Sequence, residues 1–143
     1  MKNAQQFSHE MILSANLENG LFIDATAGNG HDTLFLAQHI DSTSKILSFD
    51  IQEIAILQTR QLLQKYDLAP KVTCILDSHA NISNYLEQDE YVRLAIFNLG
   101  YLPGSDKKII TIPSSTLEAI QILLERLEKY GKIIIVSYYS HDG

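Results

Sequence analysis

Five short apolar runs, separated by segments with helical spacing, extend through the whole chain and limit its fold more than any other feature. Side chains are apolar on both alternating positions of each run, which suits strands that are covered on both faces. The segments between them, such as IQEIAILQTRQLLQKY and SSTLEAIQILLERLEKY, supply the crossovers that parallel strands require. The pattern predicts an α/β fold with a doubly wound, mostly parallel sheet. The expected strands are LFIDATA (21–27), KILSFD (45–50), KVTCILD (71–77), VRLAIFNLG (92–100) and KIIIVSYY (132–139).

The composition fits a single domain over residues 1–143. Apolar residues make up 45% of the 143 residues, which is enough for a core, and no linker, repeat or low-complexity segment marks a boundary. Cys74 is the single cysteine, which excludes an internal disulfide and argues against a cysteine-based zinc site. No segment resembles a signal peptide or reaches the roughly 20 apolar residues of a membrane span, so a cytoplasmic protein without membrane contact is expected.

The segment before Leu21 predicts a leading helix around FSHEMILSANL, covering the sheet edge or a site. On this helix, His9 beside Glu10 is interpreted as a surface residue, with a place at the mouth of a site as the alternative. Farther along the chain, Asp50 and Asp77 each close a strand. The sequence PSSTLEA places helix-capping residues before the last helical segment.

The stretch FIDATAGNGHDTLFLA ends the first strand in a turn with two glycines. In an open parallel sheet, ligands bind beyond the carboxyl ends of the strands, near the point where the strand order reverses. Gly28 and Gly30 allow a tight turn and a close approach to a ligand, and the start of the next helix offers amide donors. The turn lacks the third glycine of the dinucleotide fingerprint. Asp24 and Asp32 flank it, so it suits a cationic ligand better than a pyrophosphate.

Carboxylates are expected at the ends of three successive strands. Asp50 can accept hydrogen bonds from both hydroxyls of a ribose, and Asp77, followed by Ser78 and His79, suits the amino group of an adenine. Together with Asp24 they predict an acidic rim around one pocket. S-adenosylmethionine, an adenosine that carries a sulfonium and an ammonium, matches this pattern better than a nucleotide phosphate does. A turn or helix-cap role is the alternative for each residue taken alone.

The motifs DATAGNGHDTLFLA and FNLGYLPGSDK resemble the class I S-adenosylmethionine-dependent methyltransferases, and among them the bacterial group labelled "putative rRNA methylase". The resemblance covers nearly the whole chain. It implies a Rossmann-like fold, S-adenosyl-L-methionine as the cofactor and methyl transfer to RNA. Members of the group are associated with the tRNA wobble uridine, where they methylate 5-aminomethyl-2-thiouridine to the 5-methylaminomethyl form. A full fold of this class has two further C-terminal edge strands, and these are expected to be missing from this chain.

The resemblance also implies roles for individual residues. The fourth strand is followed in amine-modifying relatives by Asp or Asn with Pro-Pro-Tyr, whereas this chain departs from the pattern with NLGYLP. Asn98 is expected to accept a hydrogen bond from the acceptor amine and Tyr101 to stack on the base, with packing on its own domain as the alternative for Tyr101. The cofactor-binding residues implied by position are Asp24, Thr26, Gly28, Asn29, Gly30, Asp32, Asp50, Gln52, Asp77, Ser78 and His79.

The loop after the fourth strand holds the candidate substrate-binding residues Leu102, Pro103, Lys107 and Lys108. The formal net charge of −6 argues against a broadly basic surface but permits a local basic patch, and the two lysines are the only adjacent basic pair. They are expected to contact RNA phosphates, with a solvated loop as the alternative.

The expected partners are tRNA and a second copy of the chain in a homodimer. His31 and His79 match no metal-binding spacing, so no metal is expected, and a capping or adenine-side role is favoured for both. Two other functions stay open. One is the methylation of a small molecule, for which an acidic surface is no handicap. The other is a non-catalytic adenosine-binding module, in which Asn98 has no acceptor to hold.

Overall fold

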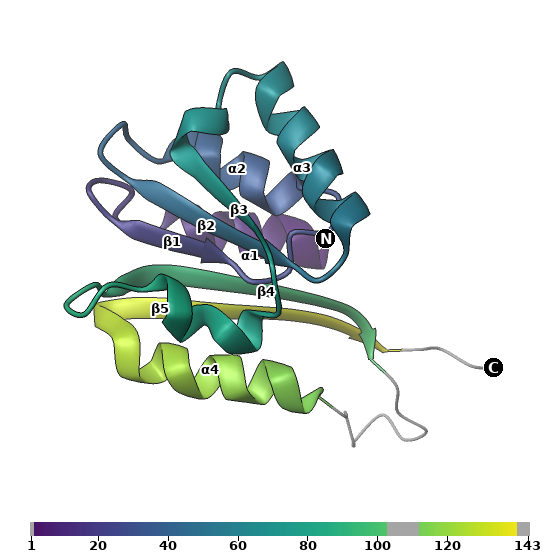
Figure 1. Cartoon of the computed structure of the whole chain (residues 1–143), viewed down its shortest axis with the longest axis vertical. Coiled ribbons are helices and arrows are strands. Elements are labelled where there is room, and N and C mark those ends of the chain that lie inside the picture. The colour runs from purple at the N-terminus through teal and green to yellow at the C-terminus, as the bar shows by residue number, and fades with distance from the viewer. Residues whose placement is uncertain (1, 103–111, 140–143) are drawn as a thin grey trace.

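A computed structural model describes residues 2–102 and 112–139, which form a layered α/β structure (Figure 1). Within these ranges the sheet has five strands, all parallel, in the order β3-β2-β1-β4-β5. The strand order reverses between β1 and β4. The prediction of a doubly wound parallel sheet is confirmed. The strands are β1 Leu21–Asp24, β2 Lys45–Asp50, β3 Val72–Leu76, β4 Val92–Leu102 and β5 Leu127–Tyr139.

Helices cover both faces of the sheet. Figure 1 shows α1, α2 and α3 on one face, and α4 with the 3₁₀ helix η2 on the other. The helices are α1 Ala4–Leu13, α2 His31–His39, α3 Glu53–Lys65, η1 Ala69–Lys71, η2 His79–Tyr85 and α4 Ser114–Arg126. In the described ranges none of these helices is long and apolar enough to cross a membrane.

Successive residues of the central strands point into two separate cores. In β1, Phe22 packs in the core under α1, α2 and α3, while Ile23 packs in the core under η2 and α4, and both are fully buried. Leu94 and Ala95 of β4 divide in the same way. This arrangement explains why the strands are apolar on both alternating positions.

Two helix boundaries differ from the sequence interpretation. The leading helix begins at Ala4 because Asn3 and Gln6 form a capping box, in which Asn3 Oδ1 accepts from Gln6 N at 2.8 Å and Gln6 Oε1 accepts from Asn3 N at 3.0 Å. The helical spacing in the sequence also continues to Tyr130, beyond the end of the last helix. α4 ends at Arg126, and β5 already begins beside β4.

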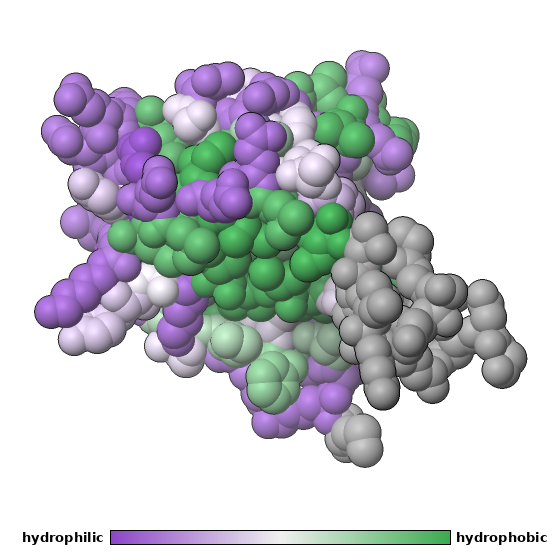
Figure 2. All heavy atoms as spheres, turned by 90° about the horizontal axis from the view of Figure 1, so that it is seen from below, coloured by the Kyte–Doolittle hydropathy of each residue, from purple (hydrophilic) through white to green (hydrophobic). Residues whose placement is uncertain are grey.

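β5 is the edge strand of the described sheet. Seen from below, a broad apolar surface crosses the molecule (Figure 2). β5 and α4, the lowest elements in Figure 1, carry exposed apolar side chains that include Leu117, Leu124 and Ile135.

Candidate functional site

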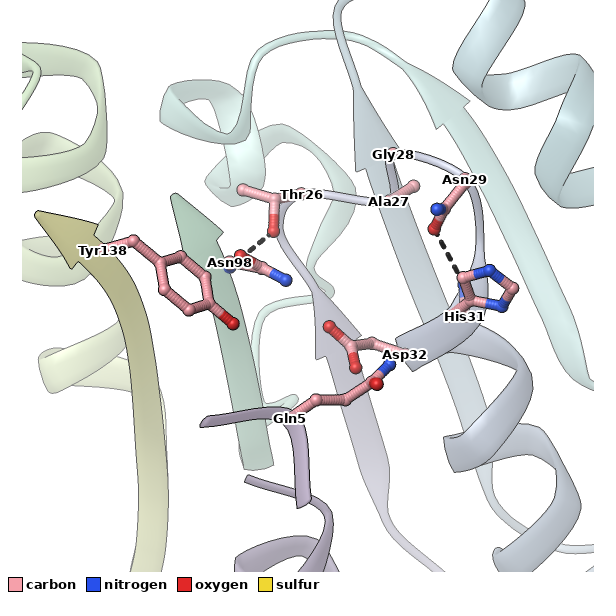
Figure 3. Close-up of a pocket in the computed structure, with 9 residues that line it drawn as sticks. All are labelled: Gln5, Thr26, Ala27, Gly28, Asn29, His31, Asp32, Asn98 and Tyr138. Atoms are coloured by element: carbon pink, nitrogen blue, oxygen red, sulfur yellow. Dashed lines mark hydrogen bonds between the residues drawn. The ribbon is translucent and has the colours of Figure 1, made fainter. Parts of the chain in front are cut away.

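Two cavities open at the carboxyl ends of the strands, around the point where the strand order reverses. The larger has a volume of about 470 Å³ and the smaller about 230 Å³, and Thr26 lines both. The larger is lined by Gln5, Thr26, Ala27, Gly28, Asn29, His31, Asp32, Asn98 and Tyr138 (Figure 3). The smaller is lined by Ala25, Thr26, Asp50, Ile51, Asp77, Ser78, His79 and Ser115.

The two glycines of the turn after β1 serve different purposes. Gly28 has a φ of +55° and lines the larger cavity, and no atom lies closer than 3.8 Å to the position of a Cβ there. Gly30 has a φ of +89°, and a Cβ would lie 3.0 Å from the Cα of Thr59 in α3. Gly30 lines neither cavity. It is therefore needed for the close approach of α3 to the turn.

The backbone donors of the turn are largely occupied by the protein itself. Thr26 N donates to Asp24 Oδ1 at 3.1 Å, and Gly28 N donates to Asp50 Oδ2 at 2.9 Å. Ala27 N donates to the carbonyl of Phe49 at 2.8 Å, and Gly30 N donates to the carbonyl of Ala27 at 2.8 Å. These four amides are therefore already paired within the protein, which leaves side-chain oxygens as the main polar groups that this turn offers to a ligand.

Asp24 lies beneath the turn rather than at the rim of the pocket. Its side chain is fully buried, and its second oxygen accepts a hydrogen bond from Thr33 Oγ1 at 2.6 Å. Burial raises the pKa of Asp24 to about 7, against the opposing effect of the Thr33 hydrogen bond. Thr33 Oγ1 also lies 2.7 Å from Ser48 Oγ. The predicted rim of three strand-end carboxylates is therefore corrected, because Asp24 supports the turn from below.

Asp32 supplies the carboxylate of the larger cavity. It lies in the first turn of α2, and Figure 3 shows its carboxylate pointing into the space between Asn98 and Gln5. Its Oδ1 lies 2.9 Å from Nε2 of His9 on α1. His9 is therefore not a free surface residue, and the alternative place at the mouth of the site describes it better. The sequence gives no signal for this contact, because 23 positions separate the two residues.

Asp50 joins the turn to the smaller cavity. In addition to Gly28 N, it accepts a hydrogen bond from Gln52 N at 2.9 Å, at the start of α3. Each carboxylate oxygen keeps a second lone pair for a ligand. Gln52, a predicted cofactor contact, has an exposed side chain that lines neither cavity.

Asp77 lines the smaller cavity next to Asp50, whose carbonyl accepts a hydrogen bond from Asp77 N at 3.0 Å. Its two oxygens accept hydrogen bonds from Tyr85 Oη at 2.6 Å and from Asn81 Nδ2 at 2.8 Å. The Tyr85 hydrogen bond is the main cause of a pKa of Asp77 below its usual value. Asp77 therefore presents an ionised acceptor at neutral pH. The next residue, Ser78, caps η2 by accepting a hydrogen bond from Ala80 N at 3.1 Å.

His79 ties three parts of the fold together. Its Nδ1 lies 2.8 Å from the carbonyl oxygen of Ala25, and its Nε2 lies 3.0 Å from Thr116 Oγ1 on α4. A carbonyl only accepts, so Nδ1 carries a proton. The ring also meets Phe97 edge to face, with 5.3 Å between centroids. Since both ring nitrogens have protein partners, His79 lines the cavity mainly as a structural wall.

Asn98 lines the larger cavity from within β4. Its backbone N–H donates to Thr26 Oγ1 at 2.7 Å, and its Oδ1 accepts from Gly100 N at 3.3 Å. The register with β5 shifts between Asn98 and Tyr101, so the strand is irregular beside the site. Tyr138 of β5 and Gln5 of α1 also line this cavity, and the sequence interpretation did not include them.

The candidate substrate residues receive less support from the structure. Leu102 is only 8% exposed, so its side chain belongs to the packed interior and not to a contact surface. Tyr101 pairs in register with Tyr138 on β5. Pro103, Lys107 and Lys108 lie outside the described residues. Across residues 2–102 and 112–139, no group of three potential ligands could hold a metal ion.

The chain resembles known proteins along most of its length. A family model described as "Putative rRNA methylase" matches residues 46–143. The chain is 32% identical over 150 residues to "tRNA (mnm(5)s(2)U34)-methyltransferase, chloroplastic" from Arabidopsis thaliana, a match that covers 99% of this chain and 55% of the plant protein. The chain thus spans about half the length of this curated relative.

Two solved structures are similar in both sequence and fold. The "putative rRNA-methylase" from Clostridium thermocellum is 39% identical, with a TM-score of 0.86 and coverage of 99% of this chain and 75% of that one. A "putative methyltransferase" from Streptococcus mutans, in complex with SAH, is 43% identical, with a TM-score of 0.78 and coverage of 94% and 72%. These similarities confirm the Rossmann-like fold that the sequence predicts.

Proposed function

Because the chain belongs to the rRNA methylase family, we propose that it is an S-adenosylmethionine-dependent RNA methyltransferase. Its acceptor in this proposal is the aminomethyl group of 5-aminomethyl-2-thiouridine at the tRNA wobble position. The observation that carries the proposal is the pair of cavities that meet at Thr26, the larger lined by the carboxylate of Asp32 and the smaller by those of Asp50 and Asp77. The name of the plant relative supports the choice of nucleoside.

The smaller cavity suits an adenosine. Asp50 would accept hydrogen bonds from the ribose hydroxyls, and Asp77 would accept one from the adenine amino group. Both residues offer oxygen acceptors, and both groups of the ligand are donors. Hydrogen-bonding capacity in this cavity therefore matches a nucleoside without phosphates.

The larger cavity suits the amino-acid end of the same ligand. Asp32 would pair with the ammonium group. None of the described residues that line either cavity is a lysine or an arginine, and the turn has committed four of its amides internally. A pyrophosphate would find few donors here, which supports S-adenosylmethionine over a dinucleotide.

Asn98 and Tyr138 define where the acceptor would enter. When bound, S-adenosylmethionine supplies an electrophilic methyl group and leaves as a neutral thioether. The protein's own task is to align the acceptor and exclude water. Asn98 Oδ1 would accept a hydrogen bond from the amine and so direct the lone pair of the amine nitrogen into the cavity. Tyr138 would close the side of the cavity formed by β5. An amine with a pKa of about 8 is roughly one-tenth neutral at pH 7, so a strong base is not required.

Methyl incorporation tests the proposal. The protein is incubated with labelled S-adenosylmethionine and with bulk tRNA that carries 5-aminomethyl-2-thiouridine, ribosomal RNA, a metabolite extract or no substrate. Label is expected in tRNA, in a nucleoside that co-migrates with the 5-methylaminomethyl form after digestion. Label in ribosomal RNA alone would overturn the choice of tRNA, and label in the metabolite extract alone would overturn the RNA substrate. Cofactor binding without transfer would favour a binding module.

A further inference from the structure

We propose that His9 is a positioning residue that orients the carboxylate of Asp32 for the ammonium end of the cofactor. The inference rests on the proposed function, because it concerns the cofactor of the same site. It adds α1 to the recognition machinery.

The contact between His9 and Asp32 is short and sheltered. Nε2 of His9 lies 2.9 Å from Oδ1 of Asp32, and the side chains are only 19% and 10% exposed. In the part of the chain that the structure describes, this is the single hydrogen bond recorded for the Asp32 carboxylate. The second oxygen is therefore available to a ligand, and His9 sets the direction in which it points.

The imidazole of His9 is itself fixed by packing. It stacks on Phe35 of α2, with 3.8 Å between ring centroids and an interplanar angle of 15°. Phe35 follows Asp32 by three positions on α2, so both side chains lie on the same side of that helix and meet one ring of α1. This geometry leaves His9 little freedom, as positioning requires.

Gln5 supports a role for α1 as a wall of the site. It precedes His9 by four positions on the helix and lines the larger cavity directly (Figure 3). Gln5 and His9 therefore bring one cavity contact and one supporting contact from the same face of α1. The capping box of Asn3 and Gln6 fixes the start of this helix.

The charges around the pair leave the carboxylate free to receive a cation. Lys2, which precedes α1, pairs with Glu10 of that helix and not with Asp32. On α2, His39 packs against Phe35 at 4.3 Å, and its Nδ1 lies 2.8 Å from the Phe35 carbonyl oxygen. Among the described residues no lysine or arginine forms an ion pair with Asp32. An imidazole N–H can thus orient Asp32 without placing a permanent counter-ion on it.

Two ligands separate this role from a general structural one. S-adenosylhomocysteine carries the amino-acid end, whereas 5′-methylthioadenosine has the same adenosine without it. His9→Ala is expected to weaken S-adenosylhomocysteine binding about tenfold, the effect of one hydrogen bond to a charged group, and to change 5′-methylthioadenosine binding less than about twofold. His9→Gln keeps an N–H donor and should restore most of the affinity. Calorimetry with both ligands measures the difference.

A matched control and a double variant complete the experiment. His39→Ala removes the other ring neighbour of Phe35 and should leave both affinities unchanged. In an Asp32→Asn background, His9→Ala should have little further effect, because coupled residues are not additive. Equal losses for both ligands in His9→Ala, or no loss at all, would overturn the inference. Wild-type protein that binds neither ligand would instead overturn the proposed function.

Discussion

The hydroxyl of Thr26 accepts a hydrogen bond from the backbone N–H of Asn98 at 2.7 Å. This bond links the turn after β1 to β4, across the point where the strand order reverses. Thr26 also lines both cavities. The position of Asn98, which is proposed to bind the acceptor amine, therefore depends on Thr26, which also borders the proposed cofactor site.

Thr26→Val should lower methyl transfer by about tenfold or more, because valine has the same shape but cannot accept the Asn98 N–H. The free energy of unfolding should fall by about 1–2 kcal/mol for the same reason. Single-turnover rates and urea unfolding measure the two effects. Thr26→Ser keeps the hydroxyl and should behave like the wild type. Equal rates for the valine and serine variants would contradict the prediction.

Asn98→Ala should lower methyl transfer by a factor of about 10–1000 at saturating cofactor, while S-adenosylhomocysteine affinity stays within about threefold. The side chain lines the larger cavity and not the smaller one, so its loss should affect the acceptor more than the adenosine. Asn98→Asp keeps an oxygen acceptor and should retain more activity than the alanine variant. Normal turnover by Asn98→Ala would mean that other residues bind the acceptor amine.

Asp50→Ala should weaken cofactor binding by about 1.5–3 kcal/mol, because charge-assisted hydrogen bonds to the ribose are lost. The variant should also unfold more easily, since Gly28 N and Gln52 N lose their acceptor. Gln52→Ala is the matched control, because it keeps the backbone N–H and removes a side chain that lines neither cavity. Calorimetry should show its affinity unchanged. A loss as large as that of Asp50→Ala would mean that the Gln52 side chain contacts the ligand.

Asp24→Asn should stabilise the protein relative to the wild type as the pH rises. The folded-state pKa of Asp24 is about 7, against 3.8 for the free side chain, so between these values the folded protein holds a proton that the unfolded chain has lost. Wild-type stability therefore falls through this window, by at most about 4 kcal/mol at roughly 1.4 kcal/mol per unit. Urea unfolding from pH 4 to 8 should show that the free energy of unfolding of the asparagine variant rises relative to that of the wild type. A constant difference would contradict the raised pKa.

Gly30→Ala should destabilise the fold by more than Gly28→Ala. Both positions have a positive φ, which costs a residue with a Cβ about 1–2 kcal/mol. At Gly30 the methyl group also meets the backbone of Thr59, whereas at Gly28 it has room. Urea midpoints compare the two variants. If both lose the same stability, the close approach of α3 is not what requires glycine at position 30.

The sequence predicts the framework well because its signals are local. Strand 45–50 is found with the predicted bounds, and Asp50 and Asp77 line a common cavity at the strand ends. The other carboxylates show the limit of such reasoning. Asp24 and Asp32 both flank the turn, yet Asp24 is fully buried and Asp32 lines a cavity, a difference that their spacing in the sequence does not predict.

Contacts between distant elements have no local signal. His9 reaches Asp32 because α1 packs beside α2, and Tyr138 reaches the cavity because β5 pairs with β4. Leu102 is a case in which a local signal misleads, because the residue lies beside a functional motif in the sequence, yet its side chain packs inward. Its position in the chain says little about the direction of its side chain.

The internal bonding of the turn after β1 has a consequence for the kinetics of binding. Thr26 N, Ala27 N, Gly28 N and Gly30 N are all bonded to protein acceptors. A ligand therefore meets a loop whose conformational entropy has already been lost on folding, and its association need not wait for the loop to order. Deuterium uptake at these amides should be equally slow with and without ligand. Association should be fast and limited mainly by diffusion and orientation.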